Sequence, residues 1–298
     1  MSRFLLSLAI GLVMVGNGLA AAPKPLPISA HNCYPLIGES NARLVEALAL
    51  GIDNIEIDLG WDQVKGRLIV GHDAAPSSGS VHPTFDSYIL PLLDAPARPD
   101  RAPTVLTIDW KTARPEAVAA FKAWLDAHAD LLSSAPKFDP SPLTVRRFTV
   151  CFTGDERAKA AYDASIPSGG TYRAFADVVH GAGAYRDDPA SYAERPATAY
   201  RRFLTFHWGV VEQGAPALAH DWTSDEAARL KAIVGACHAK GYRVRFYCLN
   251  GKGSFATIGY RFASPEAAEV RWRAASEAGV DWVASDDYAE IVRVLSGR

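Results

Sequence analysis

Two acidic residues interrupt an otherwise apolar stretch in the first quarter of the chain. Glu56 and Asp58 alternate with Ile55, Ile57 and Leu59, so on a strand both carboxylates would face the same side. Like charges held this close need a cation or a shared proton. A hard divalent ion with oxygen ligands, Mg²⁺ or Ca²⁺, meets that need. The pattern predicts a metal site here, with an exposed strand face as the alternative.

A third carboxylate and two histidines also lie at the ends of apolar runs. Asp109 closes one such run and would complete the metal site, although it could instead cap a helix that begins near Pro115. His31 and His72 each follow an apolar run directly. Imidazole titrates near neutral pH, so a pair of histidines suits general acid and base roles. The alternative is that both are structural histidines.

The segment that follows Asp58 has the pattern of a β-hairpin. Lys65-Gly66 is a turn signal between two apolar runs. If the chain turns there, the returning strand brings His72 back to about the level of Asp58. We therefore expect His72 beside the carboxylate pair, facing His31 across the same opening.

These side chains need a scaffold that brings distant segments together. Eight short apolar runs rich in Val, Ile and Phe are separated by longer helix-like stretches, an alternation typical of parallel strands with crossover helices. The expected strands are 26–30, 54–60, 105–110, 144–152, 176–180, 203–211, 243–249 and 282–285. The sequence thus predicts an α/β fold, a single (β/α)8 TIM-type barrel, whose active site gathers at the carboxyl ends of the strands.

Helix boundaries support the same organisation. The expected helices are 41–49, 115–132, 224–240 and 265–278. Thr223 and Ser264 stand where N-caps would lie, and Gly241 and Gly279 follow as C-caps. The region 183–200 has neither pattern and is expected to be an irregular insertion.

Composition and the N-terminus bear on partners and location. The 298 residues are 49% hydrophobic and 21% charged, and the net charge of -2 with scattered basic residues argues against a nucleic-acid partner. Arg3, an apolar stretch at 4–15 and small residues at 18–22 have the order of a secretory signal. We therefore expect a signal peptide at 1–22, one domain at 23–298 and export to the periplasm or the extracellular space. An uncleaved anchor and a buried helix are the alternatives, and no later stretch resembles a transmembrane helix.

Four cysteines remain, and they do not indicate a metal site. Cys33, Cys151, Cys237 and Cys248 include no CxxC pair and no cluster at zinc spacing. Export permits disulfides, but four cysteines can pair in three ways. Burial as small hydrophobic residues is the other interpretation.

Several motifs together resemble one known superfamily. They are Ala30-His31-Asn32, Asn41 with Glu46-Ala47, Gly51-Ile52-Asp53-Asn54-Ile55-Glu56-Ile57-Asp58, Gly71-His72-Asp73 and Ile108-Asp109-Trp110-Lys111. This ordered set is similar to the phospholipase C-like phosphodiesterases, which include glycerophosphodiester phosphodiesterases and phosphatidylinositol-specific phospholipases C. The segments 243–246 and 279–287 resemble the last two barrel strands of that superfamily. The His-Asn opening, the stretch 84–93 and the closing Ser-Asp-Asp resemble its branch named for altered inheritance of mitochondria.

The resemblance implies roles for the individual residues. His31 and His72 would be the catalytic acid and base, and Lys111 matches a lysine that lines the phosphate site in several relatives. Glu56, Asp58 and Asp109 would hold one divalent cation, Mg²⁺ or Ca²⁺. The implied activity is a metal-dependent phosphoric diester hydrolase acting on glycerophosphodiesters or phospholipid headgroups. A lyase that forms a cyclic phosphate, and a catalytically silent barrel that binds a phosphorylated headgroup, are the alternatives.

Three further residues are candidates for substrate binding. Glycerophosphodiester enzymes usually carry an arginine directly after the first histidine, whereas this chain has Asn32, which lacks the bidentate grip of a guanidinium. Trp208, in the middle of an expected strand, could stack on a substrate group. Asn250, at the end of another, could contact the substrate. A barrel of the amidohydrolase type is disfavoured because the first strand lacks His-x-His.

Overall fold

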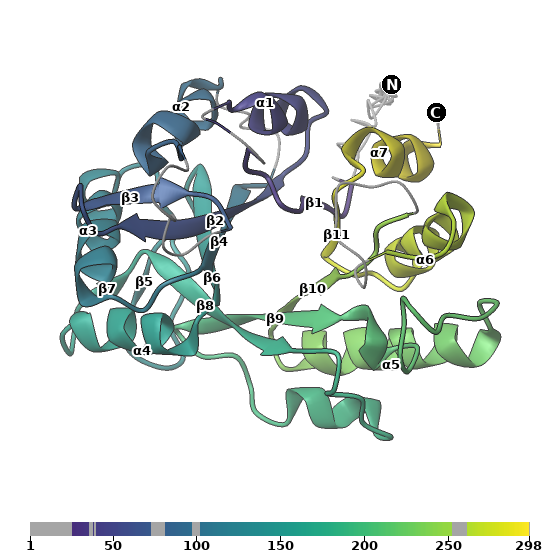
Figure 1. Ribbon diagram of the computed structural model, residues 1–298. Helices are drawn as coiled ribbons and strands as arrows, with labels where there is room; N and C mark the ends of the chain where they lie inside the picture. Colours follow the sequence, from purple (N-terminus) through teal and green to yellow (C-terminus); the bar gives the residue numbers. More distant parts are fainter. Residues whose placement is uncertain are drawn as a thin grey trace, which may run out of the picture.

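The computed structural model describes residues 26–35, 38, 40–72, 81–96, 102–251 and 261–297. Within these ranges the chain forms a closed barrel of parallel strands surrounded by helices (Figure 1). The expected signal peptide at 1–22 lies outside the described residues, as does Asp73. No helix among the described residues is long and apolar enough to cross a membrane.

Eight parallel strands close the barrel. They are β1 (Ile28–Ala30), β2 (Asn54–Asp62), β4 (Thr104–Trp110), β6 (Phe148–Gly154), β8 (Ala174–His180), β9 (Arg201–His207), β10 (Arg243–Tyr247) and β11 (Trp282–Ser285). Strand β1 pairs with β11 on one side and with β2 on the other, which leaves the parallel sheet without a free edge. The predicted single (β/α)8 barrel is confirmed, and each expected strand overlaps an observed one.

Two expected strands differ from the observed ones by four residues at one end. The strand predicted at 144–152 begins only at Phe148, because Thr144 pairs with Ser134 in an isolated antiparallel bridge. The strand predicted at 203–211 ends at His207, where the chain turns into the short 3-10 helix η2 (Trp208–Val210). Continuous apolar runs hide such changes, since buried strands and buried turns use the same side chains.

The predicted hairpin is also present. Strand β3 (Arg67–Val70) pairs antiparallel with β2, with Leu59 opposite Val70 and Asp62 opposite Arg67. The turn between them places Gly66 at φ 61°, a conformation that glycine adopts without strain. The hairpin therefore returns the chain to the carboxyl end of β2.

Helices cover the outside of the barrel (Figure 1). They are α1 (Ala42–Ala49), α2 (Phe85–Asp94), α3 (Pro115–Ala127), α4 (Glu156–Ser165), α5 (Ser224–Ala239), α6 (Pro265–Glu277) and α7 (Tyr288–Ser296). The side chains of Thr223 and Ser264 cap α5 and α6 as predicted, and Gly241 and Gly279 follow with positive φ. Between β8 and β9 the described chain forms only the 3-10 helix η1 (Pro189–Ala193), in agreement with the expected insertion.

The core lies between the strands and the helices. Large aromatic side chains fill it on the α3 side, where Trp110 and Phe152 pack edge to face and both contact Phe121. The four cysteines are free thiols and all are buried. The structure thus shows the cysteines buried as small hydrophobic residues.

A second, small sheet lies apart from the barrel strands. It consists of the two-residue strands β5 (Ala135–Pro136) and β7 (Thr171–Tyr172).

Candidate active site

The three predicted carboxylates lie together at the carboxyl ends of two neighbouring strands. Asp58 on β2 is in register with Asp109 on β4, and Glu56 lies two residues before Asp58 on the same face. One oxygen from each residue lies within 4.8 Å of the other two. Glu56 and Asp58 are buried and Asp109 is partly buried. The group therefore forms a compact, half-enclosed set of oxygen donors, which we call the carboxylate cluster.

The carboxylate cluster fits a hard divalent cation. Within the described residues, the buried oxygen Asp58 Oδ2 has no well-aligned hydrogen bond and is balanced by the ammonium of Lys111, whose Nζ lies 3.2 Å away at ion-pair distance. Burial, together with the nearby charge of Asp109 and opposed by Lys111, raises the pKa of Asp58 to about 8. A buried carboxylate with an unsatisfied oxygen and a raised pKa gains from a ligand of positive charge. Oxygen-only donors match the preference of Mg²⁺ and Ca²⁺.

Lys111 lies against the same cluster. Its ammonium contacts Asp109 Oδ2 at 2.7 Å as well as Asp58. Burial opposes the charged form, but the charges of Asp109 and Asp58 outweigh it and hold the pKa of Lys111 above its ordinary value. Lys111 is therefore a permanent positive charge at the mouth of the barrel.

His31 lies between two carboxylates. Its Nε2 is 3.9 Å from Glu56 Oε2, and its Nδ1 is 2.8 Å from Asp286 Oδ1. Burial opposes the imidazolium form, but the charge of Glu56 and the hydrogen bond to Asp286 prevail, so the pKa of His31 is raised. The ring can thus carry or accept a proton beside the carboxylate cluster.

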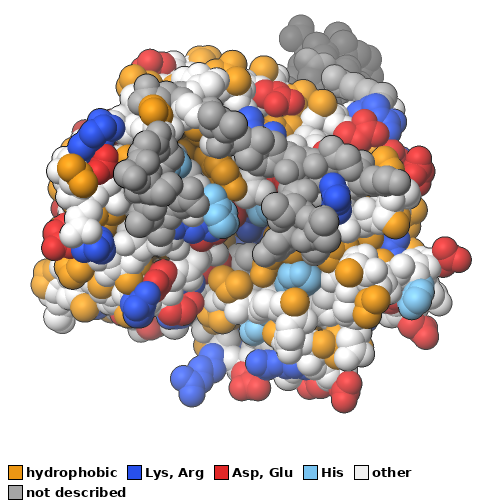
Figure 2. All heavy atoms as spheres, viewed as in Figure 1, with side chains coloured by type: hydrophobic (Ala, Val, Ile, Leu, Met, Phe, Trp, Pro, Cys, Tyr) orange, Lys and Arg blue, Asp and Glu red, His pale blue; other side chains and the backbone are white. Residues whose placement is uncertain are grey.

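His72 lies where the hairpin predicts it. The N–H of the preceding Gly71 donates to the carbonyl oxygen of Asp58 at 3.0 Å, which brings the chain just before His72 alongside Asp58 at the carboxyl end of β2. Its side chain is exposed and makes no hydrogen bond or ion pair with another residue of the described ranges. Figure 2 shows histidine, acidic and basic side chains meeting near the centre of the face in that view.

Asp286 is a site residue that sequence reasoning missed. It follows β11 directly, and besides His31 it accepts hydrogen bonds from Asn32 Nδ2 and Asn250 Nδ2, each at 3.0 Å. Its backbone N–H donates to Asn250 Oδ1 at 2.7 Å. The signal was available, since a Ser-Asp-Asp triplet closes the last apolar run, but it gave no indication of the partner.

Arg245 is the second missed residue. It lies in the middle of β10 and points into the barrel, where its guanidinium contacts Glu56 Oε2 and its Nε donates to Ser29 Oγ at 3.2 Å. An arginine between the apolar residues Val244 and Phe246 of a strand is the sequence signal, because a buried charge requires a partner. Arg245 thus holds Glu56 from the floor of the site.

The expected substrate contacts of two residues need correction. Asn250 is fully buried, and its amide is engaged with Asp286. Trp208 is also fully buried, and its indole N–H donates to Glu212 while its ring packs against Phe246. Neither side chain presents surface to a ligand. For Trp208 the reason is that the strand expected to run to residue 211 ends at His207, four residues earlier. The third residue, Asn32, lies beside His31 with its amide directed at Asp286.

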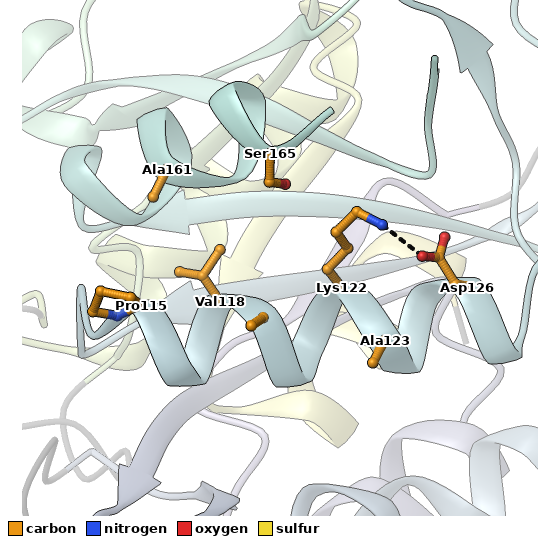
Figure 3. Close-up of a pocket in the computed structure, with 8 residues that line it drawn as sticks. Pro115, Val118, Lys122, Ala123, Asp126, Ala161 and Ser165 are labelled. Carbon is orange, nitrogen blue, oxygen red and sulfur yellow. Dashed lines mark hydrogen bonds and ion pairs between the residues drawn. The ribbon is translucent and has the colours of Figure 1, made fainter. Parts of the chain in front are cut away.

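A groove elsewhere on the molecule is unrelated to this chemistry. It has a volume of about 380 Å³ and lies on the outside, between α3 and α4 (Figure 3). Its residues are mostly small or apolar, with an ion pair between Lys122 and Asp126 at 2.6 Å along one edge. Since no residue of the carboxylate cluster lines it, the groove does not define the active site.

Comparison with known proteins bears on the fold. No protein-family model and no curated protein matches the sequence. A solved structure from Silicibacter pomeroyi, assigned as a glycerophosphoryl diester phosphodiesterase, is similar over 94% of this chain and 96% of its own, with 14% identity and a TM-score of 0.55. Two further solved structures are also similar. A Ca²⁺-dependent phosphatidylinositol-specific phospholipase C from Streptomyces antibioticus matches over 90% of this chain and 95% of its own, with 14% identity and a TM-score of 0.52, and a glycerophosphodiester phosphodiesterase from Parabacteroides distasonis matches over 91% and 96%, with 14% identity and a TM-score of 0.51. This chain shares the barrel fold of these three proteins.

Proposed function

We propose that this chain is a divalent-metal-dependent phosphoric diester hydrolase acting on glycerophosphodiesters or phospholipid headgroups. The observation that carries the proposal is the carboxylate cluster with its unsatisfied Asp58 oxygen, flanked by His31 and Lys111. The shared barrel of solved phosphodiesterases supports the reaction class. We further propose that the chain belongs to the branch named for altered inheritance of mitochondria, because its His-Asn opening, the stretch 84–93 and the closing Ser-Asp-Asp resemble that branch.

The charged residues divide the work of binding a phosphodiester. Glu56, Asp58 and Asp109 would hold the cation, which when bound supplies Lewis-acid polarisation of a phosphoryl oxygen. The ammonium of Lys111, fixed at 2.7 Å from Asp109, offsets the negative charge that develops on the non-bridging oxygens. The guanidinium of Arg245 contacts Glu56 Oε2, so it would hold the Glu56 carboxylate in position during the reaction.

The two histidines move the protons. One imidazole takes a proton from the attacking water as the new P–O bond forms, and the other gives a proton to the alcohol oxygen as its bond to phosphorus breaks. The products are a phosphomonoester and an alcohol. Asp286 keeps His31 in place through the 2.8 Å contact at Nδ1, which leaves Nε2 toward Glu56 and the reacting groups.

The test uses a generic diester, bis-(p-nitrophenyl) phosphate. We expect turnover that a chelator abolishes and that Mg²⁺ or Ca²⁺ restores. Full activity in excess chelator would remove the metal from the mechanism. A tightly bound phosphate ester with no product over hours would favour the silent binding barrel instead.

Phosphorus NMR on a panel of diesters identifies both the substrate and the reaction. A phosphomonoester that appears without a lag indicates direct hydrolysis. A cyclic phosphate that accumulates first indicates attack by a hydroxyl of the substrate itself. The panel should include glycerophosphodiesters and phospholipid headgroup diesters, and turnover of neither class would contradict the proposed substrates.

We also propose that the protein is exported, as the leading segment at 1–22 suggests. The buried free thiols of the barrel are compatible with an oxidising compartment, because buried cysteines do not meet oxidant or one another. Cell fractionation with mass measurement of the mature N-terminus tests this. An intact N-terminus in the cytoplasm would exclude it.

A further inference from the structure

Asp286 is held at both carboxylate oxygens. Oδ1 lies 2.8 Å from His31 Nδ1 and accepts from Asn32 Nδ2 at 3.0 Å, while Oδ2 accepts from Asn250 Nδ2 at 3.0 Å. The backbone N–H of Asp286 returns a hydrogen bond to Asn250 Oδ1 at 2.7 Å. Two asparagines that are far apart in the sequence therefore each donate a hydrogen bond to a different oxygen of the Asp286 carboxylate.

The backbone has a positive φ at Asn32 and again at Cys248, two residues before Asn250. Asn32 has φ 51°, in the left-handed region that asparagine tolerates better than most residues. Asn250 follows Cys248, another non-glycine residue with positive φ, of 66°. Strand β11 lies between β1 and β10, so the ends of those two strands flank the end of β11, where Asp286 emerges.

The asparagine amides have little left for a ligand. Asn250 is fully buried, so no part of it reaches the mouth. The side-chain oxygen of Asn32 accepts from the hydroxyl of Tyr34 at 3.0 Å, while its nitrogen donates to Asp286 Oδ1 at 3.0 Å and lies 3.1 Å from His31 Nδ1. Their hydrogen bonds thus belong to the support of Asp286.

We propose that Asn32 and Asn250 are positioning residues, which lock Asp286 so that it accepts the Nδ1 proton of His31 and leaves His31 Nε2 facing the carboxylate cluster. An ionised carboxylate only accepts hydrogen bonds, so its partner nitrogen must carry the proton. Fixing one tautomer of a catalytic histidine through its other ring nitrogen is a common way to orient the reacting atom. The catalytic part of this inference rests on the proposed function, whereas the orientation of His31 does not.

The first experiment removes one amide without straining the backbone. Asn32→Gly keeps the positive φ accessible and deletes the side chain. We expect kcat on bis-(p-nitrophenyl) phosphate to fall about tenfold with KM within about twofold, the pattern of a lost effect on the reacting state. Asn41→Gly is the matched control, since the Asn41 side chain makes no capping hydrogen bond at α1. A raised KM with unchanged kcat would make Asn32 a substrate contact and overturn the proposal.

A double-mutant cycle separates the two roles further. If Asn32 acts through Asp286, Asn32→Gly should change kcat less than about twofold in an Asp286→Ala background. If Asn32 binds the substrate directly, its full effect should persist in that background. Additive effects would therefore reject the positioning role.

The last experiment does not depend on turnover. Nitrogen-15 NMR of labelled histidine, with the His31 signals assigned from their loss in His31→Gln, reports which ring nitrogen carries the proton. At a pH high enough that the His31 ring is neutral, we expect Nδ1–H in the native protein and a gain of Nε2–H in Asn32→Gly and Asn250→Ser, with thermal unfolding as the check on folding. An unchanged tautomer in Asn32→Gly overturns the proposal even if Asn250→Ser does not fold. The expected tautomers in a protein without diesterase activity would reject the proposed function and leave the positioning intact.

Discussion

Two histidines at the carboxyl ends of different barrel strands lie in opposite chemical environments. His31 follows β1 and lies between the carboxylates of Glu56 and Asp286. His180 ends β8, and its ring stacks on Phe206 with centroids 4.8 Å apart and meets Tyr192 edge to face at 5.1 Å. One ring faces charged groups and the other faces aromatic rings under the insertion at 183–200.

Burial lowers the pKa of both histidines, but the net shift has opposite signs in the two places. For His180, burial lowers the pKa to about 4, with a further lowering by Arg186, and its Nε2 has no hydrogen-bond partner in the part of the chain that the structure describes. For His31, burial acts in the same direction, but the charge of Glu56 and the bond to Asp286 reverse it and raise the pKa. The comparison teaches that carboxylate partners, more than depth, decide whether a buried imidazole is favoured in its charged form.

The largest expected effect is on catalysis, which should depend on the His31 ring and not on the His180 ring. His31→Ala should lower kcat on bis-(p-nitrophenyl) phosphate by about 100- to 10,000-fold, the range of a general acid or base. His180→Phe keeps an aromatic ring in place and should leave kcat within about twofold. Stopped assays on both purified variants check this, and near-normal turnover in His31→Ala would end its catalytic assignment. His72→Ala should lower kcat by a similar factor to His31→Ala, because His31 and His72 share the proton transfers in the proposed mechanism.

The next effect concerns the charges that surround His31 but not His180. Asp109→Asn removes one oxygen charge from the carboxylate cluster and should raise the Mg²⁺ or Ca²⁺ concentration for half-maximal activity by about 100-fold. Asp126→Asn, in the surface pair with Lys122, is the matched control and should change nothing. Equal cation requirements in the two variants would argue against the cluster as the metal site.

A smaller effect is expected at the neighbouring ammonium. Lys111→Met removes the charge that offsets the phosphoryl oxygens and should lower kcat about tenfold or more. Lys122→Met, on the outer face of α3, is the control for a loss of lysine charge. If the two variants keep equal kcat values, Lys111 serves only to balance the carboxylates.

The smallest effect is on stability and comes from His180. Its pKa is about 4 when folded and 6.5 in the reference state, so the unfolded chain binds more protons between these values. The free energy of unfolding should therefore fall as the pH drops from about 6.5 to 4. His180→Phe should remove a loss of about 2–3 kcal/mol in that window. Urea unfolding at both ends of the window measures it, and the same pH dependence in both proteins would contradict the assignment.

Local patterns in the sequence determined much of this molecule. The eight strands, the hairpin at Lys65-Gly66 and the shared face of Glu56 and Asp58 follow from hydrophobic periodicity and turn chemistry, which act between residues close in the chain. These features also predicted that Asp109 would join the pair, because the carboxyl ends of parallel strands meet at one end of a barrel.

Only the tertiary structure decided which charges face one another. Asp286 lies 255 residues from His31, and Arg245 lies 189 residues from Glu56, yet closure of the barrel between β1 and β11 brings each pair into contact. The apolar run around Trp208 likewise gave no sign that the strand ends at His207 and buries the indole. Periodicity reports which face of a strand a side chain occupies, but the partner across the barrel depends on strand order and register, which no local pattern encodes.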